Sequence, residues 1–364
     1  MYTICSYCHQ IDKTPFQPIW LCDCGKPREI HYNWEGQKRP IDIDENKQSL
    51  WRYHTVLPDI DEKVTLDEGY TPLLQIENNL WIKDETLNPT GSFKDRGMGL
   101  AVTMAKAQGV ESICLPSAGN AGVSAAAYCK EAGIDCHVFL PETIPEPFKK
   151  ATGQYGAHLT LSGKTISDAA KAMLDKKEND WFDISTLKEP FRVEGKKTLG
   201  YEIAEQMHWS LPDVIIYPTG GGTGLIGMWK AFNEMVGMGW VADKMPRMVG
   251  TQSDGCAPVV KAFQARAKDT FFWDDSNTIA LGLNVPGPLG GHWILDILAQ
   301  SKGIAVSTPE KELTTLTNDI NQKAQINSSA ETGTVWSAYC ALKSNGWIGI
   351  NEKVVLFATG IERN

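Results

Sequence analysis

Apolar runs and amphipathic segments alternate along most of this chain. Short apolar runs, typical of buried strands, lie at 80–82, 112–115, 135–140, 157–161, 181–184, 214–217, 248–251 and 354–357. Segments with a helical spacing of apolar residues lie at 98–107, 121–132, 166–174, 199–207 and 312–324. Because parallel strands need a crossover, usually a helix, this order predicts an α/β fold whose parallel sheets carry helices on both faces.

Residues 88–97, Asn-Pro-Thr-Gly-Ser-Phe-Lys-Asp-Arg-Gly, join the first of these strands to the first helix. Asn-Pro-Thr-Gly is turn chemistry, and Ser92 is expected to cap the helix. Lys94 then lies in the first helical turn, where its cation opposes the helix dipole and the neutral amine is favoured. A neutral lysine amine can form a Schiff base. The alternative is a surface lysine in a Lys-Asp-Arg charge cluster.

This stretch resembles the lysine loop of the threonine synthase and threonine dehydratase group, which are fold-type II enzymes that use pyridoxal phosphate (PLP). The pattern of that group is an acidic residue, two variable residues and then Asn-Pro-Thr-Gly-Ser-Phe-Lys-Asp-Arg-Gly, and residues 85–97 match it throughout. The likeness extends from about residue 69 to residue 359. It implies that Lys94 carries the cofactor, with Phe93 beside it in the cofactor site.

The resemblance also implies a two-domain arrangement like that of the tryptophan synthase β chain. We expect a large cofactor-binding domain from residues 37–95 and 201–364, and a small substrate-side domain from residues 96–200. The cofactor would lie in the cleft between them. The expected assembly is a homodimer that acts on a small amino-acid substrate.

Residues 117–122, Ser-Ala-Gly-Asn-Ala-Gly, follow a predicted strand and precede a predicted helix. Small residues there let the backbone approach a ligand at the carboxyl end of the strand. The simpler interpretation is a tight turn with Asn120 as a helix cap. In the family, this asparagine bonds the 3-hydroxyl of the cofactor and the loop holds the substrate carboxylate. The resemblance thus gives a cofactor role to Asn120 and substrate roles to Ser117 and Ala121.

A glycine-rich stretch at 219–224 follows the strand at 214–217. The backbone amides of Gly220, Gly221, Gly222, Thr223 and Gly224, at a helix N-terminus, are expected to form a phosphate site. Gly222-x-Gly224-x-x-Gly227 also fits the dinucleotide pattern, so a nicotinamide-dependent oxidoreductase is the alternative. That pattern needs an acidic residue at the end of the next strand, about 20 residues on. The first acid after the next strand is Asp254, which is later, so the sequence favours a phosphate-only site.

Thr359 ends the last predicted strand. In the family, a Ser or Thr at this place bonds the pyridine nitrogen of PLP. A hydroxyl there makes the ring a milder electron sink than an aspartate would, which suits elimination and replacement. After Gly360 the chain reads Ile-Glu-Arg-Asn, where family members usually read Leu-Lys. Glu331 matches a family acid near the substrate or ring, and an exposed glutamate at a helix start is the alternative.

The expected substrate side is residues 186–192, Thr-Leu-Lys-Glu-Pro-Phe-Arg. Threonine synthases use the equivalent segment to bind the phosphate of O-phosphohomoserine, and Arg192 matches that use. Leu187 replaces a phosphate-binding serine, Glu189 would repel an anion, and Lys188 could compensate. The resemblance favours conversion of O-phosphohomoserine to threonine and phosphate by a PLP-dependent carbon–oxygen lyase, whereas the departures at Leu187 and Glu189 count against a phosphorylated substrate. A threonine or serine dehydratase is the alternative.

Composition excludes several other classes of function. The chain has 364 residues, a net charge of -9 and 42% hydrophobic residues, as in an ordinary two-domain globular protein. No basic block points to nucleic acid or to an anionic membrane, and no apolar run nears 18 residues. The N-terminus lacks the pattern of a signal peptide, so a cytoplasmic location is expected.

Four of the nine cysteines, Cys5, Cys8, Cys22 and Cys24, form two close pairs near the N-terminus. Two such pairs can hold a structural zinc ion, and residues 1–36 are expected to form a zinc-ribbon-like segment. The second pair has one intervening residue instead of two, so a degenerate ribbon without metal is the alternative. His9 could also serve as a ligand. Residues 37–68 are polar and are expected to connect this segment to the body.

Overall fold

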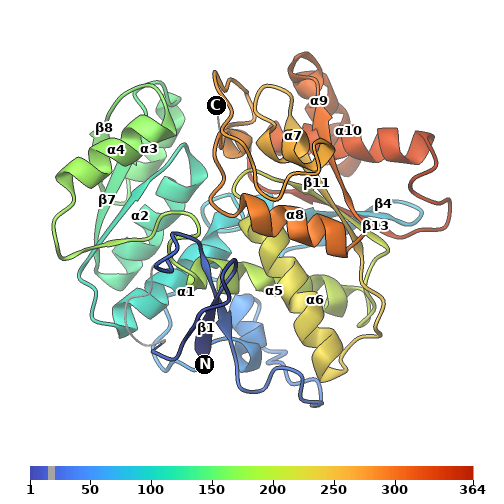
Figure 1. Cartoon of the computed structure of the whole chain (residues 1–364), viewed down its shortest axis with the longest axis horizontal. Helices are drawn as coiled ribbons and strands as arrows, with labels where there is room; N and C mark the ends of the chain where they lie inside the picture. The colour runs from blue at the N-terminus through green and yellow to red at the C-terminus, as the bar shows by residue number, and fades with distance from the viewer. Residues whose placement is uncertain (15–20, 364) are drawn as a thin grey trace.

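The structure, a computed structural model, describes residues 1–14 and 21–363. A large sheet, a smaller sheet and an N-terminal antiparallel ribbon organise these residues, and the two main sheets form separate lobes (Figure 1). The expected α/β fold with parallel sheets is confirmed. The expected domain boundaries stay a prediction.

The large sheet has the strand order β12-β11-β10-β13-β5-β4, and only the β4–β5 pair is antiparallel. Its strands are β4 (Leu73–Glu77), β5 (Leu80–Asp84), β10 (Val214–Pro218), β11 (Arg247–Ser253), β12 (Ile304–Thr308) and β13 (Val354–Ala358).

Helices cover both faces of this sheet because its strands are apolar on both sides. In β10, Ile215 packs in one hydrophobic cluster and Ile216 packs in another. The first cluster is shared with α5 (Phe191–Gln206), α6 (Thr223–Met238), α7 (Pro258–Gln264) and α8 (Gly291–Gln300). The second is shared with α9 (Leu313–Ala324) and α10 (Glu331–Ser344).

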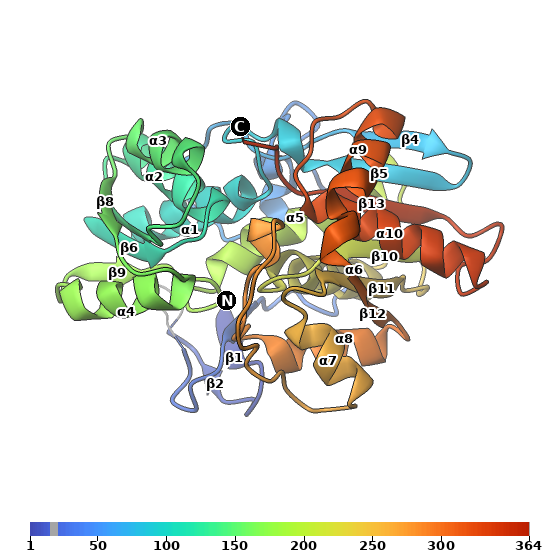
Figure 2. The same cartoon turned by 90° about the horizontal axis from the view of Figure 1, so that it is seen from above.

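The small sheet is all parallel, with the order β8-β7-β6-β9. Its strands are β6 (Ser112–Pro116), β7 (Asp135–Leu140), β8 (His158–Leu161) and β9 (Trp181–Asp183). One face packs against α1 (Lys94–Ala107), α2 (Asn120–Ala132) and α3 (Glu146–Gly153), and the other against α4 (Ile166–Lys176). Figure 2 shows the small sheet and its helices as one lobe beside the large sheet.

The N-terminal ribbon consists of β1 (Tyr2–Cys5), β2 (Ile11–Asp12) and β3 (Arg28–His31), all antiparallel. Residues 15–20 of the expected zinc-ribbon segment lie outside the described residues. The segment 37–68 is more than a polar connector, because it contains a buried 3₁₀ helix, Leu50–Val56. Its Leu50 and Trp51 join Ile30 of β3 and Leu100 of α1 in one hydrophobic cluster.

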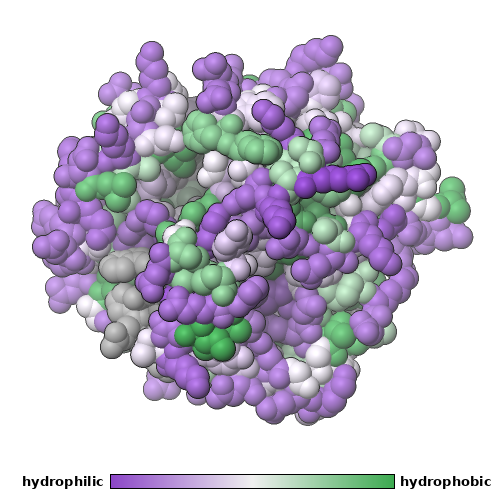
Figure 3. Space-filling model, in the orientation of Figure 1, coloured by the Kyte–Doolittle hydropathy of each residue, from purple (hydrophilic) through white to green (hydrophobic). Residues whose placement is uncertain are grey.

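Shorter 3₁₀ helices complete the described structure, at Glu85–Leu87, Leu281–Leu283 and Glu310–Glu312. The face of the molecule in Figure 3 is largely hydrophilic, with hydrophobic side chains in small groups. Across the described ranges, no helix has both the length and the apolar character needed to span a membrane.

Candidate active site

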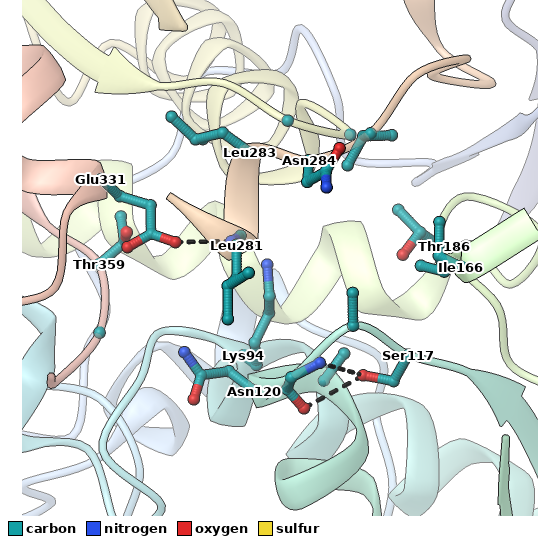
Figure 4. A pocket seen from close by; sticks show the side chains of 18 of the residues that line it. Lys94, Ser117, Asn120, Ile166, Thr186, Leu281, Leu283, Asn284, Glu331 and Thr359 are labelled. Carbon is teal, nitrogen blue, oxygen red and sulfur yellow. Dashed lines mark hydrogen bonds between the residues drawn. The ribbon is translucent and has the colours of Figure 1, made fainter. Parts of the chain in front are cut away.

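One cavity of about 700 Å³ contains every loop that the sequence singled out as a candidate for chemistry. The start of α1 supplies Lys94, the loop after β6 supplies Asn120, and the loop after β13 supplies Thr359. The glycine-rich loop after β10 closes another wall. All of these loops follow the carboxyl ends of parallel strands, where ligands of open α/β sheets usually bind. Figure 4 shows the Lys94 side chain directed into the cavity.

The ammonium group of Lys94 is poorly stabilised in this cavity. Burial lowers the pKa of Lys94 to about 7, the Arg192 cation contributes to the lowering, and Glu331 opposes it. The expected shift towards the neutral amine is confirmed in direction, although burial is the largest cause. Phe93 lies beside Lys94, with its ring centroid 4.1 Å from the lysine Nζ. The Phe93 amide donates to the Thr359 carbonyl at 3.0 Å and so ties this loop to β13.

The charges that follow Lys94 are buried, so the alternative of a surface charge cluster is wrong. The Asp95 carboxylate accepts hydrogen bonds from the hydroxyls of Thr90, at 2.5 Å, and Ser124, at 2.6 Å. Arg96 is fully buried between the carboxylates of Glu85 and Glu202. These pairs fix the loop on both sides of Lys94.

The predicted cap by Ser92 is also wrong. The N-cap of α1 is Phe93, which makes no side-chain cap bond, and the buried Ser92 hydroxyl has no hydrogen-bond partner within the described ranges. Ser92 instead bridges by its backbone to Gly360, after β13. Ser92 thus contacts the segment after β13 and does not cap α1.

The loop after β6 is closed by the Ser117 hydroxyl, which accepts from the amides of Gly119, at 3.1 Å, and Gly122, at 2.9 Å. Gly119 has φ 142°, a value that favours glycine, and it is the N-cap of α2. Asn120 is therefore the first residue of the helix and not its cap. Its side chain and Ala121 line the cavity, and Figure 4 shows Asn120 close to Lys94.

The glycine-rich loop presents its backbone to the cavity at the N-terminus of α6. Gly222, the N-cap, has φ 76°, and Thr223 begins the helix as expected. A side chain at Gly220 would place its Cβ 2.5 Å from the Gly282 carbonyl oxygen, and one at Gly224 would overlap the Tyr217 hydroxyl. Free amides at a helix N-terminus bind phosphate well, so this loop could hold the phosphate of a cofactor.

Thr359 and Glu331 lie close to each other on another wall of the cavity (Figure 4). Glu331 is 7% exposed, so the alternative of an exposed glutamate at a helix start is wrong. Its carboxylate accepts from the Gly282 amide at 2.6 Å and from the Ser329 hydroxyl. These bonds fix the position of the Glu331 carboxylate at the cavity.

The substrate-side segment divides into residues that face the cavity and residues that do not. Lys188 and Arg192 line the cavity, whereas Leu187 and Glu189 do not. Leu187 has φ 64° and is buried in the core of the large sheet. Glu189 accepts from the amides of Phe191, at 2.7 Å, and Arg192, at 2.9 Å, and so begins α5. The expected repulsion of an anion by Glu189 is therefore not supported by its position.

The two cations of this wall are held differently. Lys188 pairs with the Asp183 carboxylate at 2.9 Å and remains partly exposed. Arg192 is 2% exposed and donates through Nη1 to the Ile184 carbonyl at 2.7 Å. Its Nε finds no acceptor among residues 1–14 and 21–363. The burial lowers the pKa of Arg192 to about 10, so it stays a cation at neutral pH.

Several cavity residues carry no signal in the sequence. Tyr217 resembles any core residue of a buried strand, yet it lines the cavity and its hydroxyl has no partner within the described chain. Residues 277–289 form a long wall with little regular structure and thus no periodicity to detect. Arg363 reaches the cavity from the last described residues.

The four N-terminal cysteines lie together, away from the cavity. The Sγ atoms of Cys5 and Cys24 are 3.5 Å apart, as are those of Cys8 and Cys22, and all four lie within 4.8 Å of one another. His9 is exposed and is not part of this cluster.

Comparisons with known proteins agree with this geometry. Residues 64–360 match the family model described as pyridoxal-phosphate dependent enzyme. The threonine synthase of Methanocaldococcus jannaschii is 33% identical, over 94% of this chain and 88% of the relative. The threonine synthase of Methanosarcina acetivorans is 30% identical, over 94% and 87%.

Solved structures share the fold at low identity. A fungal L-serine ammonia-lyase from Rhizomucor miehei superposes with a TM-score of 0.71 at 19% identity, covering 83% of this chain and 96% of that one. A threonine deaminase from Solanum lycopersicum gives 0.67 at 20%, covering 92% and 95%. The family match removes the support for a nicotinamide-dependent oxidoreductase. The chain belongs to the pyridoxal-phosphate-dependent enzymes of fold type II, in the threonine synthase and threonine dehydratase group.

Proposed function

We propose that this protein is a threonine synthase, which converts O-phospho-L-homoserine to L-threonine and inorganic phosphate. The observation that carries the proposal is the wall formed by Lys188 and Arg192, two cations in the same cavity as Lys94. The threonine synthases at 30–33% identity over 94% of the chain support it. The positions of Leu187 and Glu189, outside the cavity lining, remove the main objection to a phosphorylated substrate.

The cofactor would be held by four loops around the cavity. Lys94 would carry it covalently, and the amides of Gly220 to Gly224 would bind its phosphate. The Asn120 amide would bond the 3-oxygen, and the Thr359 hydroxyl would bond the ring nitrogen. The bound cofactor supplies an electron sink for the bonds to the substrate Cα. The glycine loop fits the cofactor phosphate because its backbone is open to the cavity. Side chains at Gly220 and Gly224 would meet neighbouring protein atoms, so these positions need glycine.

The protein groups around the substrate would then bind it and move its protons. Ser117 and Ala121 belong to the loop proposed to hold the substrate carboxylate. Arg192 and Lys188 would bind the phosphate and stabilise it as it leaves. Lys94, whose pKa is about 7, would both accept and donate protons at Cα, Cβ and Cγ.

A dehydratase acting on threonine or serine remains the second candidate. The pairing of Lys188 with Asp183 at 2.9 Å favours it, because a paired lysine is less available to a substrate phosphate. A dehydratase would need a site for the amino acid but none for a second phosphate.

The deciding experiment offers O-phosphohomoserine, threonine and serine separately to the cofactor-loaded enzyme. We expect O-phosphohomoserine to give threonine and phosphate in equal amounts, with threonine and serine reacting far more slowly. Arg192→Ala should lower kcat/KM for O-phosphohomoserine by about 2–4 kcal/mol, the scale for losing one partner of a desolvated charge pair. Release of ammonia and 2-oxobutyrate from threonine, with O-phosphohomoserine inert, would establish the dehydratase instead.

We also propose that Cys5, Cys8, Cys22 and Cys24 hold a structural zinc ion. Tetrahedral zinc with Zn–S bonds of about 2.3 Å places its sulfurs about 3.8 Å apart. The observed 3.5 Å separations are close to that value. We further propose that the protein forms a homodimer, as the family resemblance leads us to expect.

A further inference from the structure

The last described residues run back along the lysine loop. The Ile361 amide donates to the Gly91 carbonyl at 2.9 Å, and Gly360 bridges to Ser92. A side chain at Gly91 would meet Ile361 within 2.6 Å, so the two segments are closely packed. These contacts fix where the side chain of Arg363 begins.

The Arg363 guanidinium joins three elements at the cavity. Its Nε donates to Oδ1 of Asn120 at 3.1 Å, and its Nη2 donates to the Thr90 carbonyl. The guanidinium also lies 5.6 Å from the ring centroid of Phe148 on α3. It therefore links the end of β13 to the lysine loop and to the small-sheet lobe.

The bond to Arg363 decides which way the Asn120 amide faces. A guanidinium has only donors, so it must meet the amide oxygen and not the NH₂ group. The NH₂ group then faces the cavity, as Figure 4 shows. Gly360 leaves room for it, since a Cβ there would lie 2.9 Å from Nδ2 of Asn120. Without Arg363 the amide could turn over and present its oxygen to the ligand.

We propose that Arg363 is a positioning residue, which holds the Asn120 amide so that its NH₂ group donates to an anionic oxygen of the cofactor. The inference rests on the cofactor role proposed for Asn120, but it does not depend on the identity of the substrate. If the Asn120 amide turned over, its oxygen would face the anionic oxygen of the cofactor and repel it. The orientation of this amide therefore decides whether Asn120 attracts or repels the cofactor oxygen.

A double-mutant cycle tests the proposal through cofactor binding. Arg363→Ala should weaken PLP binding by about 10- to 100-fold, the range for one hydrogen bond that involves a charged group. In an Asn120→Ala background the same change should cost less than about threefold, because the amide to be oriented is gone. Arg363→Lys, which keeps one donor, should recover part of the loss. Lys353→Ala, a change of an exposed lysine, should have no effect.

The spectrum of the bound cofactor separates this role from a general structural one. Arg363→Ala should shift the pH at which the visible spectrum changes, and the shift should disappear in the Asn120→Ala background. Circular dichroism and thermal melting confirm that each variant is folded. Equal losses in both backgrounds, or no loss in the wild-type background, would overturn the proposal. Inactivity towards O-phosphohomoserine would refute the threonine synthase assignment and leave this test intact.

Discussion

The lowered pKa of Lys94 predicts how the cofactor-free protein takes up PLP. With an ordinary pKa of 10.5, about one lysine in 3,000 is neutral at pH 7, whereas with a pKa of about 7 half are neutral. Only the neutral amine attacks the cofactor aldehyde. The loading rate should therefore rise with pH, pass its midpoint at about 7 and level off well below pH 10.

Two substitutions should move that midpoint in opposite directions. Glu331→Gln keeps the size of the side chain and an acceptor for the Gly282 amide, but it removes the anion that raises the pKa of Lys94. The midpoint should fall by about one pH unit, equivalent to about 1.4 kcal/mol of charge interaction. Arg192→Met removes a cation that lowers the pKa, so the midpoint should rise by a similar amount.

The assay is rapid mixing of cofactor-free protein with PLP across the pH range, followed by borohydride reduction and peptide mapping to verify attachment at Lys94. The same reaction with Nα-acetyl-lysine corrects for the titration of the cofactor itself. Lys171→Ala, at an exposed position on α4, is the matched control. A midpoint near 10, or shifts of the same sign in Glu331→Gln and Arg192→Met, would refute the reasoning.

Three further predictions concern the rest of the molecule. Elemental analysis of protein purified without chelators should find about one zinc per chain, and Cys22→Ser should release it without changing the cofactor spectrum. Glu202→Gln should lower the free energy of unfolding by about 3–5 kcal/mol in denaturant titrations, because it leaves the buried Arg96 short of a charge partner. Burial opposes ionisation of Glu202, but Arg96 lowers its pKa to about 2, so its stabilising effect should be complete above pH 4.5 and lost as the pH falls towards 2. Gly224→Ala should weaken PLP binding in a cofactor titration, since the new Cβ would lie 2.0 Å from the Tyr217 hydroxyl and 2.4 Å from its Cζ, so the loop must shift.

The sequence could predict the elements that bury apolar residues in a regular pattern. The predicted strand at 135–140 coincides with β7, and the strand at 214–217 differs from β10 by one residue. The predicted helix at 199–207 is the end of α5, which begins at Phe191. The apolar pattern does not reveal the first turns of α5, because charged residues there, including Glu194 and Lys197, pair with each other inside the protein. A search for regularly spaced apolar residues treats charged positions as solvent-exposed, but the charged positions at the start of α5 are buried.

The candidate site was predictable where backbone chemistry dictates the residue type. The glycines at 220–222 and 224 and the turn before Lys94 leave a mark in the sequence, and the structure brings the glycine-rich loop and Lys94 to one cavity. The orientation of a side chain leaves no such mark. Glu189 looks like a cavity residue because it lies between Lys188 and Arg192, but it turns to the backbone amides that begin α5. Neighbours in sequence point in different directions once the chain bends.

The buried Arg192 connects the geometry to the choice of substrate. Arg192 is 2% exposed, and its Nε has no acceptor in the described part of the chain. Such a group is costly, because a buried charge without full pairing destabilises the fold by several kcal/mol. The chain has carboxylates nearby that could have paired with it, yet Glu189 binds backbone amides and Asp183 binds Lys188. An anionic ligand in the cavity would supply the missing acceptor and recover that cost on binding. A neutral hydroxyl of threonine or serine would recover much less, so the cost of Arg192 to the free enzyme is better explained by a substrate that carries its own phosphate.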